Sequence, residues 1–229
     1  MSRSQPGADR QAAELRAAGH RVVVAPVLAI EALQPPLPAG DFDLVLFLSE
    51  HAVRFGLTAI AELSWFGAAR VLAVGARTAE RLAERGVDPE VPAEPTSEGL
   101  LALPTLERVA GRRVLLVAGE GGRSLLAETL TARGAEVVRY ECYRRVALDR
   151  LDPAVLDCDV LIAASGDGLE QAARLWRAHG GRDDLAVLVP SARVAALGVE
   201  LGFVNLHDCA GADSAAWLRG LAELQSSSA

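Results

Sequence analysis

Small and hydroxyl residues stand where predicted strands end and predicted helices begin. They are Ser49, Gly75–Thr78, Gly119–Arg123, Ser165–Gly168 and Ser191–Arg193. The N-terminus of a helix carries unpaired backbone N–H groups and the positive end of the helix dipole, so it binds anions without a lysine side chain. Ligands of parallel α/β sheets bind beyond the carboxyl ends of the strands. With such helix starts, even an acidic protein is able to bind a ligand that is rich in carboxylates.

One tyrosine adds a group that can donate a proton. Tyr140 and Tyr143 are the only tyrosines, and they flank Cys142 in an extended segment between two predicted lobes. Tyr143 is either a half-buried residue at a domain junction or a phenol that donates a proton or a hydrogen bond to a substrate. No Ser-His-Asp, Cys-His or paired-carboxylate arrangement is visible, and the scattered histidines and cysteines predict no metal site.

The chain repeats itself once at a fixed offset. Asp43–Ser49 and Asp159–Ser165 lie 116 residues apart, the difference between positions 43 and 159, and the same offset carries Val71–Ala79 onto Val187–Ala195. A period this long is typical of a duplicated domain of about 100 residues. Two similar α/β lobes leave a cleft between them, and such clefts are common small-molecule sites.

Each candidate residue also has a structural interpretation. Ser49 and Ser165 are typical of helix N-caps, whose hydroxyl groups accept a hydrogen bond from the helix backbone. Thr78 corresponds to Val194 in the repeat, which indicates either different duties for the two lobes or a cap in one of them. Arg123 lies in a predicted first helical turn, where a cation opposes the dipole, so a role in binding an anion is favoured.

Short apolar runs alternate with helical stretches along the whole chain. The runs show little polar alternation, as expected of strands buried on both faces of a parallel sheet. Several helical stretches are followed by a glycine, where a left-handed cap is common; these are Gly19, Gly86, Gly134 and Gly202. The pattern predicts an α/β fold with parallel sheets. We predict strands at Arg21–Ala25, Leu44–Leu48, Val71–Val74, Val114–Val117, Glu136–Tyr140, Val160–Ala163, Ala186–Val189 and Phe203–Leu206, and helices at Ala12–Ala18, Thr78–Arg85, Ser124–Arg133 and Gly168–Ala178.

The two halves of the repeat differ near the N-terminus. A strand at Arg113–Val117 precedes a helix in the second half, whereas the partner of that strand in the first half would fall before Met1. We therefore expect the first strand of the N-terminal lobe to be missing. Prolines at 35, 36 and 38 and the stretch Asp149–Pro153 mark the expected passages between the lobes.

Composition excludes several classes of protein. The net charge of −7 and the lack of a long basic run argue against a nucleic-acid partner. All 23 basic residues are arginine, which excludes Schiff-base chemistry and a Walker A site, since both need a lysine. The apolar runs fall far short of the roughly 20 residues of a membrane span, and no signal peptide is visible. We expect a soluble, cytoplasmic protein.

Several segments along nearly the whole chain form a pattern through their order and spacing. They are Ser2–Ala8, Phe47–Val53, Val74–Ala79, Thr96–Leu101, Gly122–Leu126, Arg133–Ala135 and Tyr143–Arg144. Each segment alone is weakly specific, but together and in this order they resemble the uroporphyrinogen-III synthase family.

The resemblance implies two similar flavodoxin-like, doubly wound parallel-sheet lobes that are joined by a two-stranded linker. Residues 1–30 and 149–229 would form one lobe, residues 35–140 the other, and residues 27–34 and 141–148 the linker. The implied reaction cyclises hydroxymethylbilane to uroporphyrinogen III, with inversion of the last pyrrole ring and loss of water, and without a cofactor or metal.

The resemblance also implies roles for individual residues. Tyr143 matches a tyrosine that assists departure of the hydroxyl group of the bilane. The predicted substrate-binding residues are Arg3, Ser49, Thr78, Ser97, Arg123, Ser165 and Ser191.

Hydroxymethylbilane is the expected small-molecule partner, with transient handover from hydroxymethylbilane synthase. We expect a monomer, because no long heptad or extended apolar surface helix is visible. One alternative is a catalytically inactive two-lobe module, either tetrapyrrole-binding or regulatory, that leaves the isomer ratio unchanged. Another is a nucleotide-dependent transferase, which would need a phosphate-binding loop; Gly119–Arg123 lacks the full GxGxxG spacing of such a loop.

Overall fold

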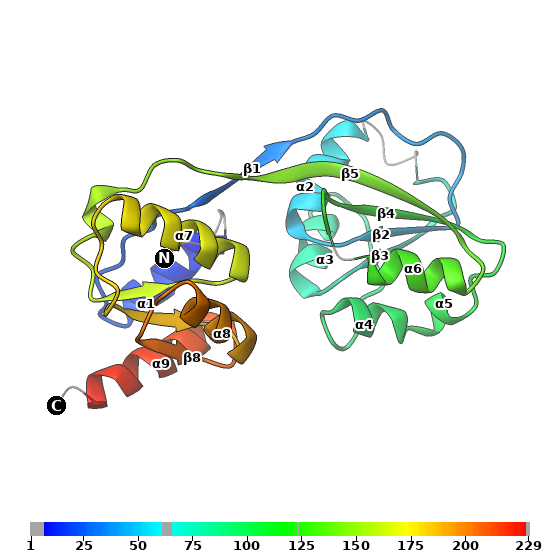
Figure 1. The fold of residues 1–229 in the computed structure, drawn as a ribbon. Coiled ribbons are helices and arrows are strands. Elements are labelled where there is room, and N and C mark those ends of the chain that lie inside the picture. The colour runs from blue at the N-terminus through cyan, green and yellow to red at the C-terminus, as the bar shows by residue number, and fades with distance from the viewer. Residues whose placement is uncertain (1–6, 61–65, 123, 228–229) are drawn as a thin grey trace. The chain divides into compact units, whose positions relative to one another are not determined.

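The computed structural model describes residues 7–60, 66–122 and 124–227. Figure 1 labels many of the elements along the chain. The helices are α1 (Gly7–Ala17), α2 (Glu50–Ala59), α3 (Ala76–Ala83), α4 (Ser97–Leu101), α5 (Pro104–Glu107), α6 (Leu125–Ala132), the 3-10 helix η2 (Pro153–Val155), α7 (Gly166–Ala178), α8 (Ala192–Glu200) and α9 (Ser214–Ser227). The strands are β1 (Leu28–Ala32), β2 (Leu44–Phe47), β3 (Arg70–Ala73), β4 (Arg113–Gly119), β5 (Glu136–Ala147), β6 (Val160–Ile162), β7 (Ala186–Val189) and β8 (Leu206–Asp208).

The chain divides into two compact units, each with its own sheet. Unit 1 comprises Met1–Ala29 and Val146–Ala229, and unit 2 comprises Ile30–Arg145. Unit 1 contains a three-stranded sheet with the strand order β6-β7-β8. The other sheet has five strands in the order β1-β5-β4-β2-β3. The β2–β3, β2–β4, β4–β5, β6–β7 and β7–β8 pairs are all parallel. The predicted α/β fold with parallel sheets is thus confirmed.

Helices cover both faces of the sheet in unit 2. Val45 and Phe47 of β2 point into a core that α2 and α3 complete. Leu44 and Leu46 point the opposite way, into a core with α4, α5 and α6 (Figure 1). Because both faces are buried, the strands need apolar side chains at every position, which is why the sequence shows no polar alternation.

The sequence repeat recurs in the strand register and in the starts of the helices. Leu44 pairs with Arg70 between β2 and β3, and Val160 pairs with Ala186 between β6 and β7, each residue at the same offset as its counterpart. The helices that follow β3 and β7 also begin at equivalent positions, in α3 and α8. The two units therefore share a local architecture as well as a sequence pattern.

The predicted strand at Arg21–Ala25 is not a strand among the described residues. Val22 and Val24 pack against one core and Val23 and Ala25 against the other, so the burial alternates as in a strand. An apolar run reports burial, whereas a strand also needs a neighbour to complete the ladder, and no described strand pairs with this segment. The expected missing first strand and Ser2–Ser4 lie outside the described residues.

Two further predicted strands have different bounds. The predicted Phe203–Leu206 strand begins only at Leu206, because the Phe203 N–H donates to the Gly198 carbonyl of the preceding helix, 3.0 Å away. Gly202 has a left-handed φ of +84°, which lets the chain make this helix end. The Glu136–Tyr140 strand continues without a break to Ala147 as β5.

Candidate functional site

A topological switch point lies between β2 and β4 of unit 2. These strands are parallel neighbours, but α2, which follows β2, packs on one face, and α6, which follows β4, packs on the other. Where helices leave neighbouring strands in opposite directions, a crevice forms at the carboxyl ends of the strands. Ser49 follows β2 and Gly119 ends β4, so both lie at this point.

Ser49 is the N-cap of α2. Its hydroxyl accepts a hydrogen bond from the Ala52 N–H at 3.0 Å. Ser165, at the equivalent position of the repeat, caps α7 in the same way by accepting from the Gly168 N–H at 3.2 Å. The predicted N-cap interpretation is confirmed for both serines, and each satisfies a helix N–H that would otherwise lack a partner.

Ser49 also contacts the predicted catalytic tyrosine. The Ser49 Oγ and Tyr143 Oη atoms lie 3.0 Å apart, and either can be the donor. Tyr143 is only 4% exposed, within unit 2, where its ring lies 5.5 Å from the His51 ring and 6.1 Å from the Phe55 ring, centroid to centroid. The interpretation of Tyr143 as a half-buried junction residue is therefore wrong.

An irregularity in the pairing of β4 with β5 turns Tyr143 toward Ser49. Ala118 pairs with Glu141, but Gly119 pairs with Tyr143, so Cys142 is an extra residue on β5. Cys142 and Tyr143 consequently point into the same core although they are consecutive. A bulge of this kind re-aims a side chain, and bulges are common beside active sites.

Gly119 makes room for the tyrosine ring. A Cβ atom at position 119 would lie 2.6 Å from both Cε2 and Cζ of Tyr143, closer than real atoms approach. The sequence draws attention to Gly119 only as part of a weak phosphate-loop pattern, and it draws none to His51 or Phe55. Their shared contact with Tyr143 arises from segments far apart in the chain, which no local spacing reveals.

The remaining candidates lie at helix starts in both units. Thr78 is buried in α3, whose N-cap is Gly75, so the capping interpretation of Thr78 is wrong. Ser97 is the first residue of α4, next to the cap Thr96. Ser191 is the N-cap of α8 in unit 1 but makes no side-chain capping bond. Among the described residues, no hydrogen bond joins any of these three to Ser49 or Tyr143.

Arg3 and Arg123 lie outside the described residues.

Two polar groups next to Tyr143 along β5 are parts of the core. Burial raises the pKa of the Cys142 thiol to about 11, and this thiol donates toward the Ala52 and Ala118 carbonyls. Burial also raises the pKa of Tyr140, whose hydroxyl has no hydrogen-bond partner among the described residues. Neither group ionises near neutral pH, so neither is an activated nucleophile. Tyr143 is the phenol at the switch point.

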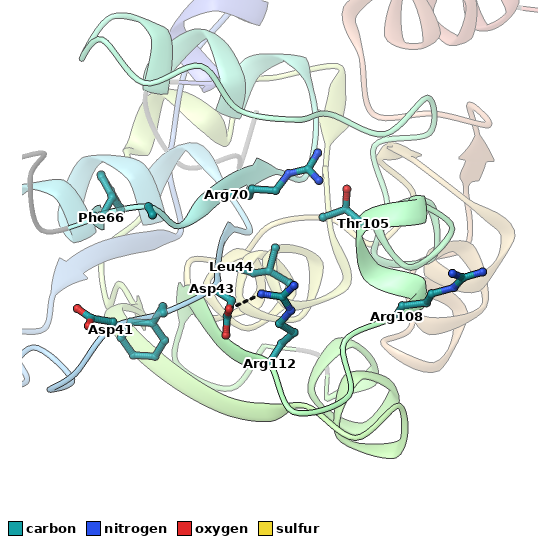
Figure 2. Close-up of a pocket in the computed structure, with 11 residues that line it drawn as sticks. Asp41, Asp43, Leu44, Phe66, Arg70, Thr105, Arg108 and Arg112 are labelled. Carbon is teal, nitrogen blue, oxygen red and sulfur yellow. Dashed lines mark hydrogen bonds and ion pairs between the residues drawn. The ribbon is translucent and has the colours of Figure 1, made fainter.

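A cavity of about 820 Å³ lies at the other end of the strands of the same sheet, away from Ser49 and Tyr143 (Figure 2). It is lined near the amino ends of β2 and β3, by Asp43 and Arg70 among others. Its charges are largely paired, with Arg112 2.6 Å from Asp43 and Arg70 2.9 Å from Glu90. Because ligands of parallel sheets bind at the carboxyl ends, we do not assign the functional site to this cavity.

The described residues contain neither a metal-binding cluster nor a helix that could span a membrane. No three His, Cys, Asp or Glu side chains among them come together in a way that could hold a metal ion. None of the helices there is both long and apolar enough to cross a bilayer.

Comparisons with known proteins agree with one another. A family model described as "Uroporphyrinogen-III synthase HemD" matches residues 9–205. The chain is 39% identical over 192 residues to the uroporphyrinogen-III synthase of Salmonella typhimurium, covering 78% of each chain. It is 36% identical over 197 residues to that of Escherichia coli K12, covering 80% of this chain and 79% of that one. The structure of uroporphyrinogen-III synthetase from Helicobacter pylori shares the fold, with a TM-score of 0.67 and 15% identity over 90% of this chain and 96% of that one.

Proposed function

We propose that this chain cyclises hydroxymethylbilane to uroporphyrinogen III, because it belongs to the uroporphyrinogen-III synthase family. The observation that carries this proposal is the 39% identity to a synthase over 78% of both chains. The reaction expels the terminal hydroxyl of the linear bilane as water, inverts the last pyrrole ring through a spiro intermediate and closes the macrocycle. This is one step of tetrapyrrole biosynthesis.

The protein's task in this reaction is mainly one of position. The bilane closes unaided to the isomer without inversion, so the enzyme must hold it such that the substituted carbon of the last ring is attacked. In our proposal, backbone N–H groups at helix N-termini bind the acetate and propionate groups. Thr78, Ser97, Ser165 and Ser191 stand at such helix starts, which supports this role. Arg3 and Arg123 also belong to the predicted substrate-binding set, as does Ser49, whose hydroxyl contacts Tyr143.

Tyr143 is the proposed catalytic residue. Its phenol lies at the carboxyl edge of the sheet and is hydrogen-bonded to Ser49, which supports donation of its proton to the departing hydroxyl group. Tyr140 is less suited to this role, because its buried hydroxyl has no hydrogen-bond partner in the part of the chain that the structure describes.

We further propose that units 1 and 2 are the two doubly wound lobes of the family. In unit 2 the neighbouring strands run in the order β5-β4-β2-β3, and a bridge from Leu72 to Glu90 adds a fifth position beside β3. If β4 is counted as strand 1 and β5 as strand 2, this order corresponds to the flavodoxin-like order 2-1-3-4-5, which supports the proposal. In this proposal residues 27–34, which include β1, and residues 141–148, which include the end of β5, form the linker, since each segment contains residues of both units. Hydroxymethylbilane synthase is the proposed source of the substrate, and the cytoplasm the proposed location.

The test is incubation with freshly generated hydroxymethylbilane, followed by oxidation and chromatographic separation of the uroporphyrin isomers. We expect an excess of isomer III over a control without protein. Isomer I alone, from a folded protein, would contradict the proposal and favour a tetrapyrrole-binding module that performs no chemistry.

A further inference from the structure

We infer that Ser49 is a positioning residue for Tyr143, and that its hydroxyl serves the reaction through the phenol rather than by binding the substrate. This inference rests on the proposed function. The observation behind it is that Ser49 Oγ has two partners within the protein, the Ala52 N–H at 3.0 Å and Tyr143 Oη at 3.0 Å. A serine committed to two internal partners has little capacity left for a carboxylate of the substrate.

The hydrogen-bonding capacity of a hydroxyl sets the direction of the Ser49–Tyr143 bond during the reaction. A serine hydroxyl has one proton and two lone pairs, and one lone pair of Ser49 accepts from Ala52. Its proton is free to point at Tyr143 Oη, which leaves the phenolic proton free for the substrate. Once Tyr143 has lost that proton its oxygen can only accept, so Ser49 must then donate. Because Ser49 already donates to Tyr143 Oη before this transfer, the serine hydroxyl keeps its direction throughout the step.

The proton balance of the step closes within the substrate and the tyrosine. The C–O bond of the bilane's hydroxymethyl group breaks, and its electron pair leaves on oxygen. The phenolic proton of Tyr143 converts the departing hydroxide into water. The proton released when the attacked pyrrole ring regains its aromaticity restores the phenol, so no further reactant is needed. Between these two transfers the Ser49 O–H stabilises the phenolate with a charge-assisted hydrogen bond.

The start of α2 strengthens this donor. Ser49 caps a ten-residue helix, and the Ala52 N–H that it accepts belongs to the positive end of the helix dipole. Accepting that bond polarises the serine hydroxyl and makes its proton a better donor, because hydrogen bonds in a chain reinforce one another. The helix thus favours negative charge on Tyr143 Oη through a single intervening hydroxyl.

Packing keeps the phenol beside its partner. The Tyr143 ring lies over Gly119, where a Cβ atom would come within 2.6 Å of it, and its other neighbours are the rings of His51 and Phe55. These contacts fix the ring, while Ser49 sets the direction of the hydroxyl proton. Removing the serine hydroxyl therefore changes the behaviour of the phenol without displacing it.

A double-mutant cycle with Ser49→Ala, Tyr143→Phe and the double variant tests this role, with kcat and KM measured for formation of isomer III. We expect Tyr143→Phe to lower kcat about 100-fold, the lower range for a general acid. Ser49→Ala should lower kcat about tenfold with KM changed less than about twofold, as for a lost transition-state donor. The double variant should be no slower than Tyr143→Phe, because Ser49 acts only through the phenol.

Two further variants separate positioning from helix capping. Ser49→Thr keeps both the hydroxyl and the cap and should restore most of the wild-type kcat. Asp213 caps α9 by accepting a hydrogen bond from the Ala216 N–H. As the control for a lost cap, Asp213→Ala should lower Tm and leave kcat unchanged. Comparing Tm and kcat of Ser49→Ala with those of Asp213→Ala shows whether the fall in kcat of Ser49→Ala exceeds the effect of a lost helix cap.

Three results would overturn the inference. Multiplying effects in the double variant would show that Ser49 acts independently of Tyr143. A rise in KM with unchanged kcat in Ser49→Ala would make Ser49 a direct ligand of the substrate. A folded wild-type chain that produces only isomer I would refute the proposed function and this role with it, whereas the first two results leave that function intact.

Discussion

Asp43 illustrates how one residue can be held differently from its counterpart in the repeat. Its carboxylate accepts hydrogen bonds from the Arg113 backbone N–H at 2.8 Å and from the Arg112 guanidinium at 2.6 Å. The Arg113 bond, and then Arg112, hold the pKa of Asp43 below its usual value. Asp159 occupies the same position of the repeat, and among the described residues no hydrogen bond reaches its carboxylate. The contact thus belongs to unit 2 and not to the repeat.

We expect Asp43→Asn to destabilise the protein at neutral pH and to matter progressively less in acid. Because the folded-state pKa is lowered, the stabilisation is fully present above the unfolded-state pKa of about 4 and is lost as the pH falls through the folded-state value. Urea unfolding of both proteins at about pH 7 and about pH 3 checks this, with Asp159→Asn as the matched loss of charge. A gap between wild type and Asp43→Asn that is equally wide at both pH values would contradict the assignment.

At the scale of elements, the close packing of α2 against the sheet depends on a glycine in the middle of that helix. A Cβ atom at Gly56 would lie 2.7 Å from Val117 Cγ1 of β4 and 3.5 Å from the Phe47 ring of β2. Glycine costs a helix about 1 kcal/mol relative to alanine, so its presence here reflects the close approach of α2 to the strands. That approach also sets the position of Ser49, which caps this helix.

Gly56→Ala should therefore destabilise the protein by about 1–3 kcal/mol, as overpacking does, despite the better helix propensity of alanine. Chemical unfolding measures the change in free energy. Val117→Ala removes the methyl group that would clash, so Gly56→Ala should cost less in that background than in the wild type. Stabilisation of the wild type by Gly56→Ala would show that α2 can move away from the sheet without loss.

At the scale of the whole molecule, we predict a monomer. The large hydrophobic side chains that stand out as exposed among the described residues are Val91, Val199 and Val204. Scattered apolar residues are normal on a monomer, whereas stable interfaces need a contiguous patch. Light scattering coupled to size-exclusion chromatography should give a mass of 24.0 kDa that does not change with concentration. A mass of twice that value would contradict this prediction.

Local patterns were sufficient to predict most elements of both sheets. Gly19, Gly86, Gly134 and Gly202 were expected at left-handed helix ends, and all four have positive φ. These predictions succeed because a helix cap, like the apolar run of a buried strand, depends on residues only a few positions away in the sequence. The segment Arg21–Ala25 shows the limit of such reasoning, since its ladder depends on a neighbour that the local pattern does not contain.

The sequence by itself determined the α/β class, the repeat, the two capping serines and the resemblance to one family. Only the tertiary structure decided that Ser49 and Tyr143, which are 94 positions apart, share a hydrogen bond. It also decided that an extra residue in β5 turns Tyr143 toward α2 and that Gly119 leaves space for the ring. Periodicity records which faces are buried, but a one-residue change in register and a contact between distant strand ends depend on how the strands pair.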